Sequence, residues 1–181
     1  DKRGDWAVTS QDPFETGLVA SHLSSISGAK LNIQIHTNFL DKHFKKLKFH
    51  LKIDSGMHRQ GFLPEQIEQV LEILRENKIK TESFEGLYTH FAAAKNPAFP
   101  SETRKQLNLF LEVTKKVADA GFSPIRHAAA TSGTIVFPES HLDLVRIGIG
   151  AYGLYPSREV QAGYAEKLNL QPVLTWKSIV G

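Results

Sequence analysis

The chain has 181 residues and a net charge of +3, with 41% hydrophobic and 23% charged residues, values that suit one globular domain or a large part of one. It has no cysteine, which excludes disulfides, thiolate catalysis and cysteine-ligated metals, and we expect no metal centre. No apolar run approaches the roughly 20 residues that a membrane span needs, and no signal peptide is visible behind residues 1–5, so we expect a cytoplasmic protein without a membrane segment.

The first part of the chain carries few structural signals. Residues 1–30 are punctuated by Gly, Ser, Thr, Asp and Pro, and only residues 14–24 suggest a helix. Residues 31–35 alternate between apolar and polar side chains, as in a half-buried strand, and a short helix over 38–46 is expected to follow. The lysines between positions 42 and 48 predict a solvated helix face. Because no aromatic or groove-reading element accompanies them, we expect no nucleic-acid partner.

The next two elements have clearer patterns. Residues 49–53 alternate again and end at an Asp-Ser-Gly turn signal, which predicts a strand followed by a loop. Pro64 suits the first position of a helix, which we expect to end at Asn77. Its apolar residues have the spacing of one buried helix face: Ile67, Val70, Leu71 and Leu74.

The rest of the chain continues the alternation of strands and helices. A strand is expected over 84–89, then a second helix capped by Ser101 and ended by Gly121, then a short strand near Ile125. Two more strands are predicted after a stretch of small residues at 128–133, and they span residues 142–146 and 172–180.

This order predicts an α/β fold with parallel strands and crossover helices. A closed (β/α)8 barrel of the TIM type needs about 250 residues, and this chain is shorter. An open doubly wound sheet and an incomplete barrel are therefore both compatible with the pattern.

The residues with chemical potential follow the expected strands, where the sites of parallel α/β folds lie. Glycines let backbone N–H groups approach a phosphate, and an arginine fork holds a carboxylate or an aromatic nitrogen, so the mixture suits an anionic ligand. Lys52 is unusual because a lone buried lysine is costly. The set comprises Lys52, Asp54, Arg59, His90, His127, Thr131, Ser132, Arg146, Gly148, Ile149 and Gly150.

Four segments together resemble the alanine racemase family. FHLKIDSGMHRQGF at 49–62 is similar to its HLK-hydrophobic-D-[ST]-GM-x-R-x-G segment, and EGLYTHFAAA at 85–94 is similar to its EGLxTHFA. Gln106 and Phe110 match its Q-x-x-x-F helix, and LDLVRIGIGAYGLYP at 142–156 resembles its [MV]VR-x-GI-x-YGxxP. The motifs occur in the family's order.

The resemblance implies a partial barrel that binds pyridoxal 5'-phosphate (PLP), within a three-part organisation. Residues 1–30 would be a poorly matched N-terminal segment, and residues 31–171 the partial barrel domain. Residues 172–181 would be a strand that leads into a C-terminal β domain absent from this chain.

The resemblance also implies roles at the cofactor. Arg146 matches the arginine that hydrogen-bonds the PLP pyridine nitrogen, and because arginine does not readily lose its proton, that nitrogen would stay unprotonated. His90 is expected at the cofactor, as the histidine that supports Arg146. Phosphate-binding positions are matched by Thr131, Gly148 and Ile149.

On the substrate side, Arg59 matches the arginine near the PLP phenolic oxygen and the substrate carboxylate. Lys52 matches a lysine that is carbamylated in some members and that steadies this arginine, which gives the unusual lysine a supporting role. One departure is Ala130-Thr131, where the family has an Asn-Ser pair, so the amide side chain is absent.

The family's two catalytic bases are not found in the sequence. Its PLP-binding lysine lies in a V-K-A-x-A-Y-G-like motif that does not occur here, and its tyrosine lies in the C-terminal domain and acts across a homodimer. Two-base chemistry needs a group on each face of the substrate. We therefore predict that this chain alone neither attaches PLP covalently nor racemises alanine.

The function implied for the parent protein is PLP-dependent interconversion of L- and D-alanine, with D-alanine supplied for peptidoglycan. A racemase for another amino acid, such as serine, is the nearest alternative. A non-catalytic PLP-binding barrel protein is a third, against which residues 152–180 argue because such proteins lack this segment.

Overall fold

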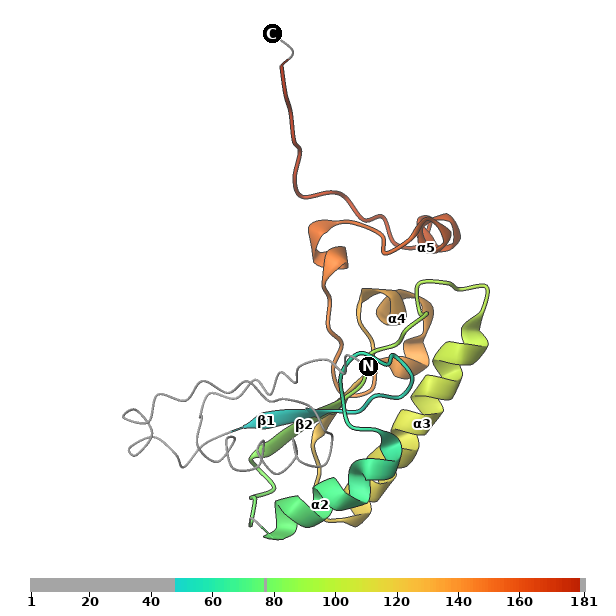
Figure 1. Ribbon diagram of the computed structural model, residues 1–181. Helices are drawn as coiled ribbons and strands as arrows, with labels where there is room; N and C mark the ends of the chain where they lie inside the picture. Colours follow the sequence, from blue (N-terminus) through green and yellow to red (C-terminus); the bar gives the residue numbers. More distant parts are fainter. Residues whose placement is uncertain (1–47, 77, 180–181) are drawn as a thin grey trace, which may run out of the picture.

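A computed structural model describes residues 48–76 and 78–179 of the chain (Figure 1). The elements expected over 14–24, 31–35 and 38–46 lie outside the described residues. The described part is built on a three-stranded parallel sheet of order β1-β2-β3, which confirms the α/β class. The strands are β1 (Phe49–Lys52), β2 (Phe84–Tyr88) and β3 (Ile125–His127).

Two helices cross over between these strands and cover one face of the sheet (Figure 1). A 3-10 turn, η3 (Pro64–Gln66), leads into α2 (Ile67–Glu76), and the expected apolar stripe of this helix is buried. The second crossover helix, α3 (Pro100–Asp119), buries Phe110 completely in the shared core. The helices thus cover one face of the sheet, so a site can be formed by strand side chains on the other face.

The start of α3 differs from the expected capping by Ser101. The helix begins one residue earlier at Pro100, whose ring restricts φ to a helical value and whose missing N–H costs nothing in the first turn. Ser101 therefore lies inside the helix. The end of α3 agrees with the prediction, since Ala120 is the C-cap and Gly121 follows with a positive φ of 89°.

The predicted strand over 142–146 is wrong. Only an isolated parallel bridge joins Arg146 to Ala130, and the residues before it form a turn in which Leu142 has a φ of +51°. Asp143 is held by Arg126, whose Nε and Nη2 donate to its carboxylate at 2.8 and 2.9 Å. Asp143 N–H also donates to the carbonyl oxygen of Arg126 at 3.1 Å, so one ion pair and single backbone contacts hold the segment beside β3, where a strand would pair continuously.

The predicted strand over 172–180 is also not formed within the described residues, which end at 179. An extended segment becomes a strand only when another backbone pairs with it, and apolar alternation alone does not supply the partner. The segment is exposed, with Trp176 at 89% and Ile179 at 96% accessibility. In Figure 1 it runs away from the sheet.

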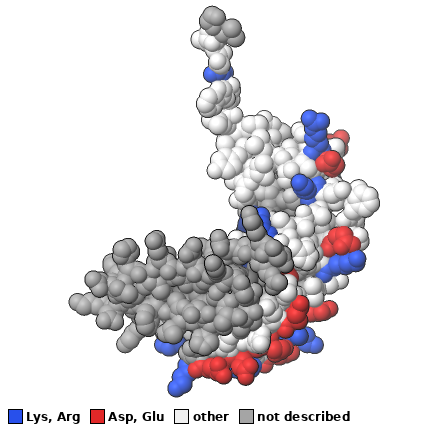
Figure 2. Space-filling model, viewed as in Figure 1, with Lys and Arg blue, Asp and Glu red and all other residues white. Residues whose placement is uncertain are grey.

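The remaining helical elements lie beyond the carboxyl ends of the strands (Figure 1). They are α4 (Thr131–Val136), the 3-10 turns η4 (Pro138–Ser140) and η5 (Ile149–Tyr152), and α5 (Arg158–Tyr164). In the view of Figure 2, acidic side chains gather over the part of the surface where α2 and α3 lie. No helix within the described ranges has the length and apolar character to cross a membrane.

Candidate functional site

The carboxyl ends of the three strands meet at one edge of the sheet, so the residues that follow them converge there. A buried hydrogen bond of 2.7 Å between Ser55 Oγ and Thr89 Oγ1 links the segment after β1 to the segment after β2. The next link is made by Arg146, which donates from Nη2 to the carbonyl oxygens of Thr89 and Ala128 at 2.7 and 3.1 Å. These contacts join all three strand ends.

The loop after β1 is organised by Asp54. Its Oδ1 accepts hydrogen bonds from the backbone N–H groups of Gly56, Met57 and His58 at 2.8 to 3.0 Å. Burial alone would raise the pKa of this carboxyl, but the three amide hydrogen bonds outweigh burial and hold the pKa below its usual range. Asp54 is therefore an ionised structural residue of the turn that leads to Arg59.

Lys52, the last residue of β1, is 7% exposed, and within the described part of the chain its Nζ has no hydrogen-bond partner. Burial lowers its pKa, and the nearby charges of Arg59 and Arg146 lower it further against an opposing contribution from Asp54. A buried ammonium without a partner is costly, so this lysine favours either its neutral form or an anionic neighbour.

Arg146 is the centre of the site. Its Nη1 donates to His127 Nδ1 at 2.6 Å, and its guanidinium lies 5.2 Å from the centroid of the Tyr88 ring. Together with the two backbone carbonyls, these contacts hold the guanidinium plane in one orientation. Among the residues that the structure describes, Nε–H and one Nη1–H of Arg146 have no acceptor, which leaves two of its five donors for a ligand.

The histidine that contacts Arg146 is His127, which corrects the expected support by His90. His127 ends β3 beside Tyr88, its register partner, and the two rings stack with centroids 4.9 Å apart. His90 lies two residues beyond the end of β2 and makes no hydrogen bond to Arg146. The sequence places both histidines after strands, and only the lateral neighbours of each strand decide which one meets the arginine.

His90 still belongs to the same cluster. It is half-buried, and its pKa is lowered first by burial and then by the charges of Arg146, Arg59 and Lys52. None of the ion pairs in the described ranges includes any of these three cations. Such a cluster of basic groups without a paired carboxylate suits an anionic ligand.

A second part of the site is formed by a hydroxyl and two backbone amides. Thr131, 5% exposed, accepts at Oγ1 from the N–H groups of Gly148 and Gly150 at 3.1 and 3.3 Å. A Cβ on Gly150 would lie 2.7 Å from Thr131 Cγ2, so this approach requires glycine. Space beside Gly148 is open, and Ile149 is 44% exposed. The sequence included Gly150 among the residues that suit an anionic ligand, but the resemblance assigned it no role of its own.

Ala130, where the sequence departs from the family's Asn-Ser pair, adjoins both Arg146 and Thr131. Ala130 contributes its backbone to the bridge with Arg146, and its carbonyl oxygen accepts from Thr134 Oγ1 at 2.9 Å. Its methyl group can make no hydrogen bond, so Thr131 supplies the hydrogen-bonding side chain of this pair.

Comparison with known proteins adds an independent line of evidence. The family model for the alanine racemase N-terminal domain matches residues 18–156, beginning before the first motif visible in the sequence. An alanine racemase of Oceanobacillus iheyensis is 38% identical over 135 residues, which are 74% of this chain and 34% of that protein. An alanine racemase of Desulforamulus reducens is 44% identical over 130 residues, which are 71% of this chain and 34% of that protein.

The fold is similar to solved structures as well. The structure of alanine racemase from Clostridium difficile 630 in complex with cycloserine matches with a TM-score of 0.60 and 36% identity, covering 68% of this chain and 33% of that one. The chain therefore spans about a third of the length of the relatives that it matches.

Proposed function

Because the chain belongs to the alanine racemase family, we propose that it supplies the PLP cradle of an enzyme that interconverts L- and D-alanine. The observation that carries this proposal is the cluster of Arg146, Lys52, Arg59 and His90, whose cations form no ion pair with a carboxylate among the described residues. Arg146 is bridged to Ala130, the residue before Thr131, whose hydroxyl completes the site. For the whole protein, resemblance to the family supports a cytoplasmic homodimer that provides D-alanine for peptidoglycan.

Arg146 would face the pyridine ring of the cofactor. When bound, PLP stabilises the negative charge that develops at the α-carbon of an amino acid. A guanidinium has donors and no acceptor, so a ring nitrogen opposite its free Nε–H would accept a hydrogen bond and remain unprotonated. An unprotonated ring is a weaker electron sink, which suits a reaction that returns the proton without further chemistry.

Thr131 and the backbone at Ile149 would hold the phosphate. Thr131 Oγ1 accepts from the amides of Gly148 and Gly150, so these glycines orient the hydroxyl and leave its own O–H free to donate to an anion. The N–H of Ile149, which lies between the two glycines, would bind a phosphate oxygen beside it. On the other side, Arg59 would bind the substrate carboxylate.

A non-covalent analogue of the cofactor tests this proposal. We expect 4'-deoxypyridoxine 5'-phosphate, which has no aldehyde to react with surface lysines, to bind the 181-residue chain in equilibrium dialysis. Thr131→Val should weaken binding about tenfold, the value of one hydrogen bond to a charged group. Borohydride reduction of a mixture with PLP itself should leave no specific pyridoxyl adduct, because the family's lysine motif does not occur in the sequence.

Thr114→Val is the matched control, because Thr114 lies on α3 and donates only to the carbonyl oxygen of Leu111. It should bind the analogue as the unsubstituted chain does. The proposal fails if the analogue does not bind, or if both valine variants lose affinity equally.

The state of Lys52 provides a separate prediction. We propose that its neutral amine reacts with carbon dioxide: the nitrogen lone pair attacks the carbon, one N–H proton leaves to water, and a carbamate anion results. The lowered pKa supports this because only the unprotonated amine is nucleophilic. A carbamate would also pair with Arg59 and remove the cost of the unpartnered buried ammonium.

We expect a carbamate resonance in the carbon-13 NMR spectrum of the protein equilibrated with labelled bicarbonate. Lys52→Met should abolish the resonance, since methionine fills a buried site without a charge. Lys115→Met should retain it, because Lys115 is exposed on α3. A resonance that survives Lys52→Met would contradict the assignment.

A further inference from the structure

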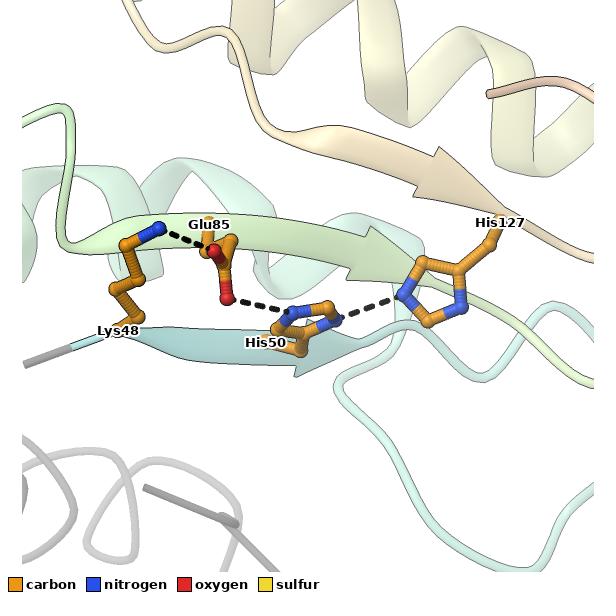
Figure 3. A network of polar contacts seen from close by, with 4 residues as sticks. All are labelled: Lys48, His50, Glu85 and His127. Carbon is orange, nitrogen blue, oxygen red and sulfur yellow. Dashed lines mark hydrogen bonds and ion pairs between the residues drawn. The ribbon is translucent and has the colours of Figure 1, made fainter. Parts of the chain in front are cut away.

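A series of polar contacts runs from the surface across the sheet to His127 (Figure 3), which in turn contacts Arg146. Lys48 Nζ donates to Glu85 Oε1 at 2.5 Å, and the other carboxylate oxygen lies 3.4 Å from His50 Nε2. His50 Nδ1 lies 2.8 Å from His127 Nε2, and His127 Nδ1 accepts from Arg146. Glu85 supplies the carboxylate in this series of contacts.

The chemistry of the two ends assigns the protons along the chain. Because a guanidinium can only donate, His127 Nδ1 must be unprotonated, and the proton of the neutral ring is on Nε2. His127 Nε2–H then donates to His50 Nδ1, which leaves the proton of His50 on Nε2. A carboxylate can only accept, so His50 Nε2–H donates to Glu85. Every contact is satisfied in this one direction.

Burial and charge agree with neutral His127 and ionised Glu85. Burial lowers the pKa of His127 to about 4, with further lowering by Arg146 and His50, so the ring is neutral at neutral pH. The hydrogen bond from Lys48 holds the pKa of Glu85 below its usual range, against the effect of burial.

An irregularity in the sheet makes this chain of contacts geometrically possible. The register shifts between Phe49 and His50, whose partners are Phe84 and Gly86, so Glu85 is the extra residue on β2. Glu85 contacts the His50 ring, and a Cβ built on Gly86 would overlap the same ring. Two successive residues of β2 thus face His50: Glu85 accepts its hydrogen bond, and Gly86, which has no side chain, leaves room for its ring.

Gly86 is what lets the ring of His50 cross the middle strand. His50 lies on β1 and His127 on β3, and β2 separates these strands. Neighbouring strands lie about 4.8 Å apart, so a direct contact between side chains of β1 and β3 must pass over β2. The missing side chain of Gly86 leaves the room, and the rings meet with centroids 5.0 Å apart.

We propose that Lys48, Glu85, His50 and His127 form a positioning relay that holds both histidines neutral with the proton on Nε2, so that His127 presents an unprotonated Nδ1 to Arg146. The relay deepens the proposed function, on which its importance rests, because it fixes the guanidinium assigned to the cofactor ring. In the relay, a carboxylate orients one imidazole and this imidazole orients the next, in the way that carboxylates orient the histidines that bind metal ions.

The proton positions can be measured directly in the unsubstituted chain. Long-range nitrogen–proton NMR spectra of the imidazole rings distinguish protonated from unprotonated ring nitrogens. We expect His50 and His127 each to have a protonated Nε2 and an unprotonated Nδ1 at neutral pH. A proton on Nδ1 of either ring would overturn the relay, whatever the chain does with the cofactor analogue.

Two substitutions of Glu85 separate the acceptor from the rest of the side chain. Glu85→Gln retains an oxygen that accepts from His50, so both histidines should keep the Nε2–H form. Glu85→Leu removes the acceptor at similar size. Because Arg146 and His127 still donate toward His50, His50 should keep its proton on Nε2, but this N–H loses its protein acceptor and its proton should exchange faster with water. An unchanged exchange rate in Glu85→Leu would show that Glu85 does not orient His50.

Gly86→Ala tests the crossing itself. The added methyl should displace the His50 ring, so that the His50–His127 hydrogen bond is lost while Arg146 still contacts His127. Gly163→Ala is the control, since a Cβ there meets no atom within 4 Å. If His127 is unaffected by Gly86→Ala, its orientation does not depend on His50. Failure of the analogue to bind, with the predicted tautomers present, would contradict the proposed function and leave the relay intact.

Discussion

Arg146→Leu is expected to lower the free energy of unfolding by about 3 kcal/mol and to abolish binding of the cofactor analogue. The substitution leaves three acceptors without their donor at the strand ends: His127 Nδ1 and the carbonyl oxygens of Thr89 and Ala128. Each buried unsatisfied group costs about 1–3 kcal/mol, and part of this cost is recovered by the apolar leucine. Urea denaturation followed by circular dichroism measures the stability, and equilibrium dialysis measures binding.

The matched control is Arg126→Leu on β3. Arg126 forms an ion pair with Asp143, but the two side chains are 42% and 40% exposed. Exposed pairs of this kind contribute about 1 kcal/mol or less, so this variant should remain close to the unsubstituted chain and should still bind the analogue. Equal destabilisation by both leucine variants would contradict the central position assigned to Arg146.

Gly61→Ala is the second substitution with a large expected effect, about 3 kcal/mol or more of lost stability. Gly61 has a φ of +121°, and a Cβ there would lie 2.7 Å from Asp54 N and 2.9 Å from Ile53 C, both backbone atoms that cannot move aside cheaply. The loop would have to separate from β1, which breaks Asp54 N–H to Phe62 O and Phe62 N–H to Lys52 O, at 2.8 and 2.9 Å.

Gly121→Ala separates backbone strain from this overlap. Gly121 also has a positive φ, +89°, but a Cβ there meets no atom within 4 Å. We expect this variant to lose only about 1 kcal/mol, the cost of the left-handed conformation alone. Thermal unfolding of both variants makes the comparison. Binding of the analogue should fall in Gly61→Ala, whose loop carries Arg59, and not in Gly121→Ala. Similar losses in both variants would contradict the packing at Gly61.

Local patterns predicted the elements whose signals are local. The apolar spacing of residues 67–74 is the buried face of α2, and Pro64 and Gly121 mark helix boundaries because their backbone preferences act wherever they stand. The predicted strand over 142–146 was wrong for the opposite reason, and no strand is formed over the described part of 172–180. A strand requires continuous pairing with a backbone from elsewhere in the chain. The segment at 142–146 makes only single backbone contacts, and the exposed segment at Trp176 has no paired strand among the described residues.

The sequence by itself determined the family, because its motifs occur in a specific order. Of the residues that we propose for the cradle, Lys52, Arg59 and Arg146 lie in these motifs, and Thr131 was predicted from its match to the family's Asn-Ser pair. Only the tertiary structure decided which histidine supports Arg146. That choice depends on the lateral order of the strands, which puts His127 beside Tyr88.

The relay also depends on the tertiary structure alone. His50 and His127 are 77 residues apart, and their contact requires a register shift on β2 and a glycine at the crossing. A single strand's sequence carries its alternation but not its register against a neighbour, since register is set by the paired backbones. For that reason the residues proposed for the cradle could be predicted from the sequence, whereas the contacts that orient them could not.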